Sequence, residues 1–377
     1  MNYPHINEFV LITFVKNTTL APGLVNLRER TMKIKLLLAF STLIAPISLS
    51  FAQTADDYVV LRTEWDQPDL QGVWNFNSST PMERPERFGT QEFLTSEEVE
   101  QDRIRQEEGR VAADAAEAVL VVNPEAPQAG SNTGGYNNFW YERASIGENV
   151  RTSLIVYPPN GRLPARVEGS AEHMANLGPV DTPGERPVLA LFGGIAKDGP
   201  EDRGLSERCM IGFNAGPPMN GGGYNANVQI FQNKDHAVIM TEMVHDARIV
   251  PLDDGGALDD DIRLWTGDSR GYWEGDTLVV QTRNFIDLIP SFSRFGNAKD
   301  KSLTERFTRV SYDTIEYEWT LEDPSTFTDK IVATMPMTKV GGTLYEYACH
   351  EGNYGMFNIL RGERMNELRA AEAEDGG

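Results

Sequence analysis

Short alternations of apolar and polar residues dominate the chain from residue 228 to residue 350. Side chains that alternate in this way point to opposite faces of a β-strand. Most of these segments are separated by short turns, so we expect an antiparallel meander that closes into a lipocalin-like barrel or folds into a sandwich. The predicted fold class is mostly β. The predicted strands are Val228–Phe231, Ala237–Ile249, Asp276–Asn284, Ser302–Ser311, Thr314–Leu321, Lys330–Met337 and Thr343–Cys349.

The first half of the chain is less regular. The segment 58–76 fits an entry segment and a first strand, and 151–157 fits a further strand; prolines follow each of them. Thr95 and Glu98 fit a capping box, which predicts an N-terminal helix from Ser96 to about residue 118. A C-terminal amphipathic helix is expected from about residue 356. The stretch 160–225 reads as a long irregular excursion, and such segments are usually functional or disordered.

Residues 32–52 have the pattern of an export signal. Lys33 and Lys35 precede an uncharged run that ends in small residues at Ala52, which predicts cleavage there and a mature protein, 53–377, with a single β-rich domain. A membrane anchor is the alternative, but the apolar run is short and contains Pro46. Residues 1–31 are interpreted as an over-extended translation start.

The charge of the chain limits its partners. A formal net charge of −22 repels nucleic acid and anionic lipid. No later stretch is long and apolar enough to span a membrane, so the mature protein is expected in the periplasm or outside the cell. A small-molecule ligand or substrate is the remaining class of partner.

The chain has two cysteines, Cys209 and Cys349, and both follow the export signal. In an oxidising compartment a single pair usually forms one disulfide. Two buried free thiols or a catalytic thiol are the alternatives. A disulfide would bring Glu207 and Arg208 close to His350.

Two patterns carry resemblances. Gly72-Val73-Trp74 and Gly271-Tyr272-Trp273 resemble the Gly-x-Trp opening of lipocalin-like barrels, in which the tryptophan plugs one end. Five further segments together resemble a large group of uncharacterised exported bacterial proteins, and this resemblance implies membership but no particular activity. These segments are Pro68–Trp74, Leu205–Cys209, Met243–Arg248, Trp273–Val280 and Tyr345–Gly355.

Two histidines stand beside carboxylates in strongly patterned segments: His245 with Asp246, and His350 with Glu351. Histidine exchanges protons most easily near neutral pH. The alternation places His245 on the apolar face of its strand, where it is either a core histidine or a proton-transfer residue. His350 would end its strand, where sites are commonly built, although a polar turn residue fits the same pattern.

These residues predict a cofactor-independent enzyme, a lyase, isomerase, hydratase or hydrolase, acting on a small organic molecule in a β-lined cavity. The carboxylates would orient the imidazoles, and a separate set would bind substrate. That set is Arg248, Arg270, Trp140 and Asn353.

Other functions fit the same sequence. The first alternative is a periplasmic binding or carrier protein without catalysis, and another is a polysaccharide-binding module. Outward-facing histidines around an apolar cavity would favour carriage. A metal site could be drawn from Glu242, His245, His350 and Glu351. No nucleophile elbow, phosphate loop or dinucleotide fingerprint occurs in a convincing context, which disfavours serine hydrolase, kinase and nicotinamide-dependent chemistry.

The export signal makes a first prediction. Protein purified from the envelope or medium of a bacterial host should begin at or within a few residues of Gln53, because the small residues before it suit a signal peptidase. Intact mass measures this directly. A mass that retains residues 32–52 would contradict cleavage.

Overall fold

The computed structural model describes residues 58–122, 150–170, 198–222, 224–252, 256, 258–293 and 295–375. The predicted export signal and Trp140 lie outside these ranges. The part of the chain from Gln53 onward forms one unit.

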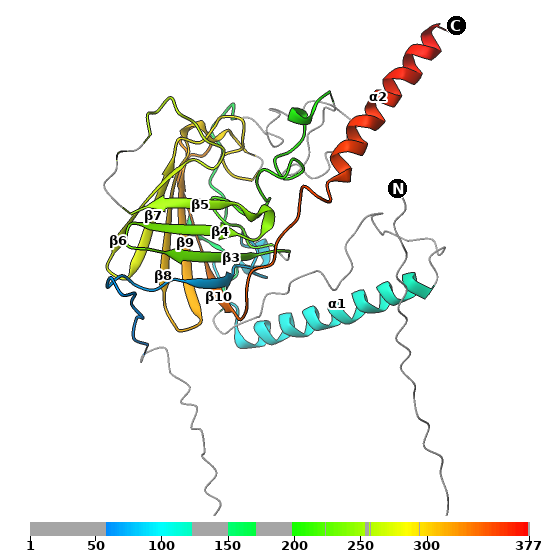
Figure 1. Ribbon diagram of the computed structural model, residues 1–377. Helices are drawn as coiled ribbons and strands as arrows, with labels where there is room; N and C mark the ends of the chain where they lie inside the picture. The colour runs from blue at the N-terminus through cyan, green and yellow to red at the C-terminus, as the bar shows by residue number, and fades with distance from the viewer. Residues whose placement is uncertain are drawn as a thin grey trace, which may run out of the picture. The chain divides into compact units, whose positions relative to one another are not determined.

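A single antiparallel sheet of ten strands organises the described residues (Figure 1). Nine strands follow one another in the order β5-β4-β3-β1-β10-β9-β8-β7-β6, and β2 pairs with β10. The strand β1 therefore joins the β3–β5 part to the β6–β10 meander. The strands are β1 Gly72–Asn75, β2 Ile155–Tyr157, β3 Asn227–Gln232, β4 His236–Thr241, β5 Ala247–Pro251, β6 Asp268–Glu274, β7 Thr277–Arg283, β8 Ser302–Arg309, β9 Thr314–Glu322 and β10 Ile331–Val340.

Two long helices accompany the sheet, one near each end of the described chain, as the sequence predicts. Helix α1 spans Ser96–Val122. The Thr95 hydroxyl accepts a hydrogen bond from the Glu98 N–H at 3.3 Å, and the Glu98 carboxylate accepts one from the Thr95 N–H at 2.8 Å, which confirms the capping box. Helix α2 spans Tyr354–Asp375, and the side-chain oxygen of Asn353 accepts a hydrogen bond from the Met356 N–H in its first turn. The short 3₁₀ helices are η2 Glu86–Phe88, η4 Pro200–Asp202, η5 Met243–His245 and η6 Ala298–Asp300.

Two of the predicted strands differ from those observed, and one observed strand is not among those predicted. The segment 237–249 is not one strand, because Val244 and His245 take positive φ angles of 63° and 47° and the chain turns there between β4 and β5. The segment around Arg270, which is not among the predicted strands, forms β6 and makes a hairpin with β7 through Gly275 at φ 60°. The predicted strand 343–349 is an irregular segment between β10 and α2.

The two edge strands, β5 and β6, share no ladder, so the hydrogen-bonded sheet is not closed into a barrel. Figure 1 shows β3, β4 and β5 side by side in front of strands of the β6–β10 meander, an arrangement consistent with a sandwich. The edges nevertheless pack closely. A Cβ added to Gly271 of β6 would lie 2.8 Å from side-chain carbons of both Val250 and Leu252. A larger residue at position 271 would require these side chains to shift.

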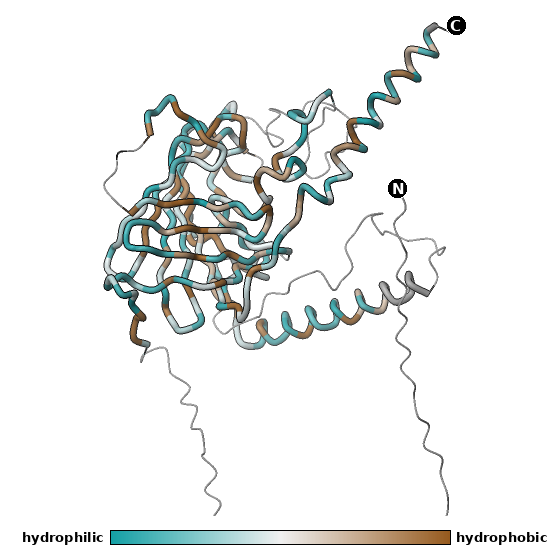
Figure 2. Tube along the Cα trace, viewed as in Figure 1, coloured by the Kyte–Doolittle hydropathy of each residue, from teal (hydrophilic) through white to brown (hydrophobic). Residues whose placement is uncertain are grey.

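The core lies between the facing strands. Apolar and polar residues alternate along them in Figure 2, and inward positions such as Trp74, Phe307, Trp319 and Met337 are almost completely buried. Burial of these large side chains is the main stabilising contribution.

The same interior holds an ion pair. Arg248 of β5 donates two hydrogen bonds to Glu305 of β8, at 2.6 and 3.0 Å, and both side chains are buried. The Tyr317 hydroxyl of β9 donates a further hydrogen bond to Glu305 at 2.6 Å. Burial, followed by the nearby negative charge of Glu305, raises the pKa of Tyr317 well above its usual value, so the phenol keeps its proton.

The burial of this pair generates a prediction. Arg248→Met should lower the free energy of unfolding by about 3–5 kcal/mol, because it leaves the Glu305 carboxylate buried without its counter-ion. The matched control is Arg306→Met, which removes an arginine paired with Glu274 at 2.9 Å on the exposed face. That change should cost about 1 kcal/mol or less. Denaturant unfolding of the three proteins measures both values, and equal losses would contradict a special role for the buried pair.

Candidate functional site

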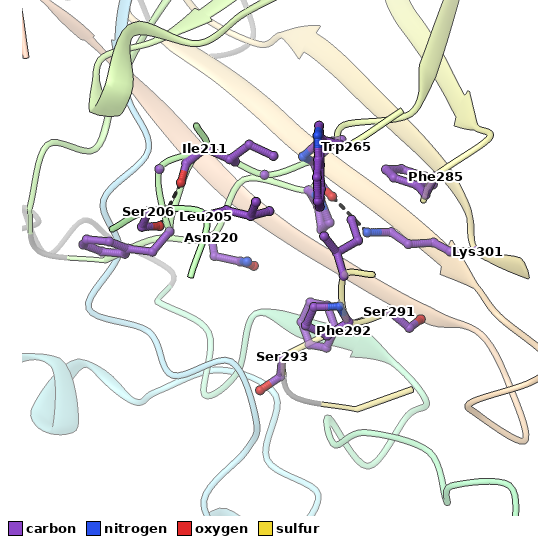
Figure 3. Close-up of a pocket in the computed structure, with 17 residues that line it drawn as sticks. Leu205, Ser206, Ile211, Asn220, Trp265, Phe285, Ser291, Phe292, Ser293 and Lys301 are labelled. Carbon is purple, nitrogen blue, oxygen red and sulfur yellow. Dashed lines mark hydrogen bonds between the residues drawn. The ribbon is translucent and has the colours of Figure 1, made fainter. Parts of the chain in front are cut away.

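A cavity of about 140 Å³ lies where the long excursion meets the segment between β7 and β8. Its walls are mostly apolar and include Leu205, Ile211, Phe285, Ile289 and Phe292. Among the residues that line it, Lys301 is the one charged side chain. Figure 3 shows the Lys301 side chain extending past Phe285 toward the group of lining residues.

Local sequence explains how one wall is shaped. Gly216 takes a φ of +78°, and a Cβ there would lie 2.4 Å from the carbonyl carbon of Pro218. Glycine is thus required at this bend. The Gly216–Pro217 and Pro217–Pro218 bonds are both cis, and the carbonyl oxygen of Pro217 accepts a hydrogen bond from Lys301 Nζ at 3.0 Å.

The environment of Lys301 is unusual for a lysine. The residue is 5 % exposed, and its Nζ lies 4.4 Å from the centre of the Phe285 ring. Burial lowers its pKa to about 8, against the opposing attraction of Glu305 and Asp323, and Arg248 lowers the pKa further. Those acids are engaged elsewhere, because Glu305 is bonded to Arg248 and the Asp323 carboxylate accepts hydrogen bonds from Ser325 and Thr326.

Two other residues of the cavity wall each carry a polar atom that has no hydrogen-bond partner among the described residues. These atoms are Ser291 Oγ and Asn220 Oδ1, and both are buried. Ser291 is only 2 % exposed. A buried polar atom without a partner costs free energy, so a ligand that bonds to these atoms would remove a cost already present in the fold.

The two cysteines form the predicted disulfide, Cys209–Cys349, with Cα atoms 5.8 Å apart. The bond fastens the irregular segment before α2 to the loop that begins at Leu205, one wall of the cavity. Asn353 strengthens the junction by donating a 2.6 Å hydrogen bond to the Glu207 carbonyl oxygen. The Asn353 side chain therefore bonds to the backbone of the loop that begins at Leu205, and its role in substrate binding stays a prediction.

A second hollow, of about 350 Å³, lies at this corner beside the disulfide. It is wide and polar, and Glu207 and Asn353 are among its lining residues. The Glu207 carboxylate is bonded to Arg203 at 2.8 Å. The disulfide therefore brings Glu207 to the neighbourhood of the 349–353 turn.

The structure corrects the predicted placement of both histidines. His245 lies in η5 rather than on a strand, and it is exposed instead of facing the core; its Nδ1 lies 3.3 Å from the Tyr347 carbonyl oxygen. His350 lies in an exposed turn and does not end a strand, and Glu351 beside it is also exposed. Neither histidine lines the cavity around Lys301.

The other residues predicted to bind substrate or to orient a histidine make contacts within the protein. The turn before β5 reverses the expected facing of this segment, so Arg248 points inward to Glu305 while Ala247 and Ile249 point outward. Arg270 pairs with Asp268 at 3.1 Å on β6. Partial burial raises the pKa of Asp246, against the opposing effect of Arg248.

The proposed metal set is not assembled. Within the described residues, which include all four candidates, no group of three or more histidine, cysteine or acidic side chains could hold a metal ion. The carboxylate of Glu242 instead accepts a hydrogen bond from Asn227 at 2.8 Å. No helix in the described part of the chain is long and apolar enough to cross a membrane.

Sequence reasoning missed Lys301, Ser291 and Asn220. None stands in a motif, and Lys301 follows a surface turn in which Lys299 is exposed. One signal did point to the region, namely the length of the excursion 160–225, part of which builds a cavity wall.

Comparisons of the chain with protein-family models, curated proteins and solved structures found no match.

The pKa of Lys301 generates a prediction about stability. The folded protein releases this proton near pH 8 and the unfolded chain near pH 10.5, so the unfolded state binds more protons between these values. The free energy of unfolding of the wild type should therefore rise by up to about 3 kcal/mol relative to Lys301→Met across this window. Lys299→Met, at an exposed position, controls for surface titration. Denaturant unfolding at several pH values measures the difference, and a constant difference would contradict the lowered pKa.

Proposed function

We propose that the protein binds a small organic molecule in the cavity beside Lys301. One observation carries this proposal: within the described residues, the cavity wall holds a buried ammonium group and two buried polar atoms without hydrogen-bond partners, inside a largely apolar lining. Such a combination, an apolar cavity with a few convergent polar groups, is typical of ligand sites. The ligand would satisfy groups that the fold leaves unsatisfied.

Binding without chemistry fits the positions of the candidate acids and bases better than histidine catalysis does. His245 and His350 are exposed and lie outside the cavity wall. Ser291 and Lys301 share the cavity, but an activated nucleophile needs a base within hydrogen-bond reach. Ser291 Oγ has no such partner among the described residues. These facts favour a binding or carrier protein over an acid–base enzyme.

We also propose that the protein is exported and that its sheet is lipocalin-like. The disulfide suits an oxidising compartment. Trp74, in the first Gly-x-Trp, is fully buried and donates a hydrogen bond to the Leu70 carbonyl oxygen, and the Arg309 guanidinium lies 5.3 Å from its ring centre. This tryptophan therefore packs against the chain that enters β1, as expected for a plug at one end of a cup-shaped sheet. Membership of the exported group stays a proposal.

Filling the cavity tests the binding function. Ile289→Trp places a large ring in the cavity wall, whereas Leu288→Trp adds the same ring one residue earlier at an exposed position outside it. Single-ring fragments should raise the melting temperature of the wild type and of Leu288→Trp, and should have no effect on Ile289→Trp. Thermal shift and calorimetric titration measure this. Equal shifts in all three proteins, or no fragment that binds, would contradict the proposal.

A further inference from the structure

We infer that the ligand of this cavity is a small carboxylic acid with a single ring, whose carboxylate pairs with Lys301 Nζ. The inference rests on the proposed function and names the class of its ligand. Three features of the cavity support it: the charge of Lys301, the hydrogen-bonding groups of the wall and the volume of the cavity.

Lys301 is a buried cation without a direct ion pair among the described residues. The Lys301 ammonium donates to the Pro217 carbonyl and lies over the Phe285 ring, while Glu305 and Asp323 act on it without forming an ion pair. An ammonium group has three N–H donors, and the carbonyl uses one. A buried charge is costly unless it is paired. A ligand carboxylate would supply both the counter-ion and acceptors for the remaining donors.

The other polar groups extend the description of the ligand. The Ser291 hydroxyl can donate to a carboxylate oxygen, because Oγ has no partner among the described residues. Asn220 Oδ1 is a buried acceptor and requires a donor. A hydroxyl group on the ligand would satisfy it. The site thus favours a hydroxy acid over a simple acid.

The cavity volume and lining set the size and character of the ligand body. A cavity of about 140 Å³ is close to the volume at which an engineered apolar cavity holds a benzene ring. Phe213, Trp265, Phe285 and Phe292 contribute aromatic surface to the wall. Aromatic side chains pack favourably against an aromatic ring. Benzoate and 4-hydroxybenzoate are therefore suitable probes.

The decisive comparison uses an acid and its neutral analogue. Calorimetric titration of the wild type should show benzoate binding at least about tenfold more tightly than benzamide, and 4-hydroxybenzoate more tightly than benzoate. Lys301→Met should lose at least about tenfold in benzoate affinity and lose the preference for the acid. Lys299→Met, an exposed lysine outside the wall, should keep both. Ser291→Ala should weaken benzoate binding and provides a second variant if Lys301→Met does not fold.

The pH dependence gives an independent readout. Because the free protein releases the Lys301 proton near pH 8, benzoate affinity should be constant from pH 6 to 7.5 and fall about tenfold per unit above pH 8, while benzamide affinity stays flat. The charged and titratable groups that act on Lys301 are Glu305, Asp323 and Arg248. Arg248 and Glu305 form a buried ion pair of their own. Loss of affinity above pH 8 is therefore assigned to Lys301.

The outcomes separate this inference from the proposed function. If benzamide, or another neutral fragment, binds as tightly as benzoate and competes with it, the carboxylate inference is wrong and the binding proposal stands. If benzoate binding is unchanged in Lys301→Met, the inference is also wrong. If neither acids nor neutral fragments distinguish the wild type from Ile289→Trp, both proposals fail.

Discussion

The buried ion pair between Arg248 and Glu305 joins the two parts of the sheet. Arg248 lies on an edge strand, and Glu305 lies in the β6–β10 meander at the far side of the strand order. The sheet has no ladder between β5 and β6, so side-chain contacts must hold its edges together. Because the two charges are buried, either one alone would be strongly destabilising, and each fixes the position of the other. The ion pair therefore requires Arg248 to point inward from β5, so that its neighbours Ala247 and Ile249 point outward.

The same carboxylate connects the core to the cavity. The Tyr317 hydroxyl donates to Glu305 and accepts a hydrogen bond from the Met219 N–H at 3.1 Å. Met219 follows the two cis prolines, and the Pro217 carbonyl holds Lys301. Hydrogen bonds thus run from the edge strand to the Met219 N–H, and the backbone from Met219 back to Pro217 links them to the cavity wall. This arrangement also explains the isolation of Lys301, because the nearest buried carboxylates are already committed to Arg248 and to hydroxyl groups.

The sequence predicts the elements whose signal is local. The alternation that defines β7 to β10 has a fixed period of two, and Thr95 and Glu98 are close enough in sequence to identify the start of α1. The errors arise where a tertiary contact overrides the pattern. Met243 and Val244 continue an apolar run, but both are buried in a small cluster against Cys209, which requires the turn at η5 and turns His245 outward. The register of β5 could not be read without that turn.

The cavity could not be predicted, because its polar residues have meaning only in relation to distant ones. A lysine in a polar segment normally lies in solvent, and nothing in the residues around Lys301 indicates that Gly216 and two prolines place a carbonyl above its ammonium group. An apolar residue at position 301 would avoid the cost of desolvating a charge. Proteins depart from locally favourable choices chiefly at functional sites. The buried cation, together with Ser291 and Asn220, is such a departure, which is why it, rather than the exposed histidines, defines the candidate site.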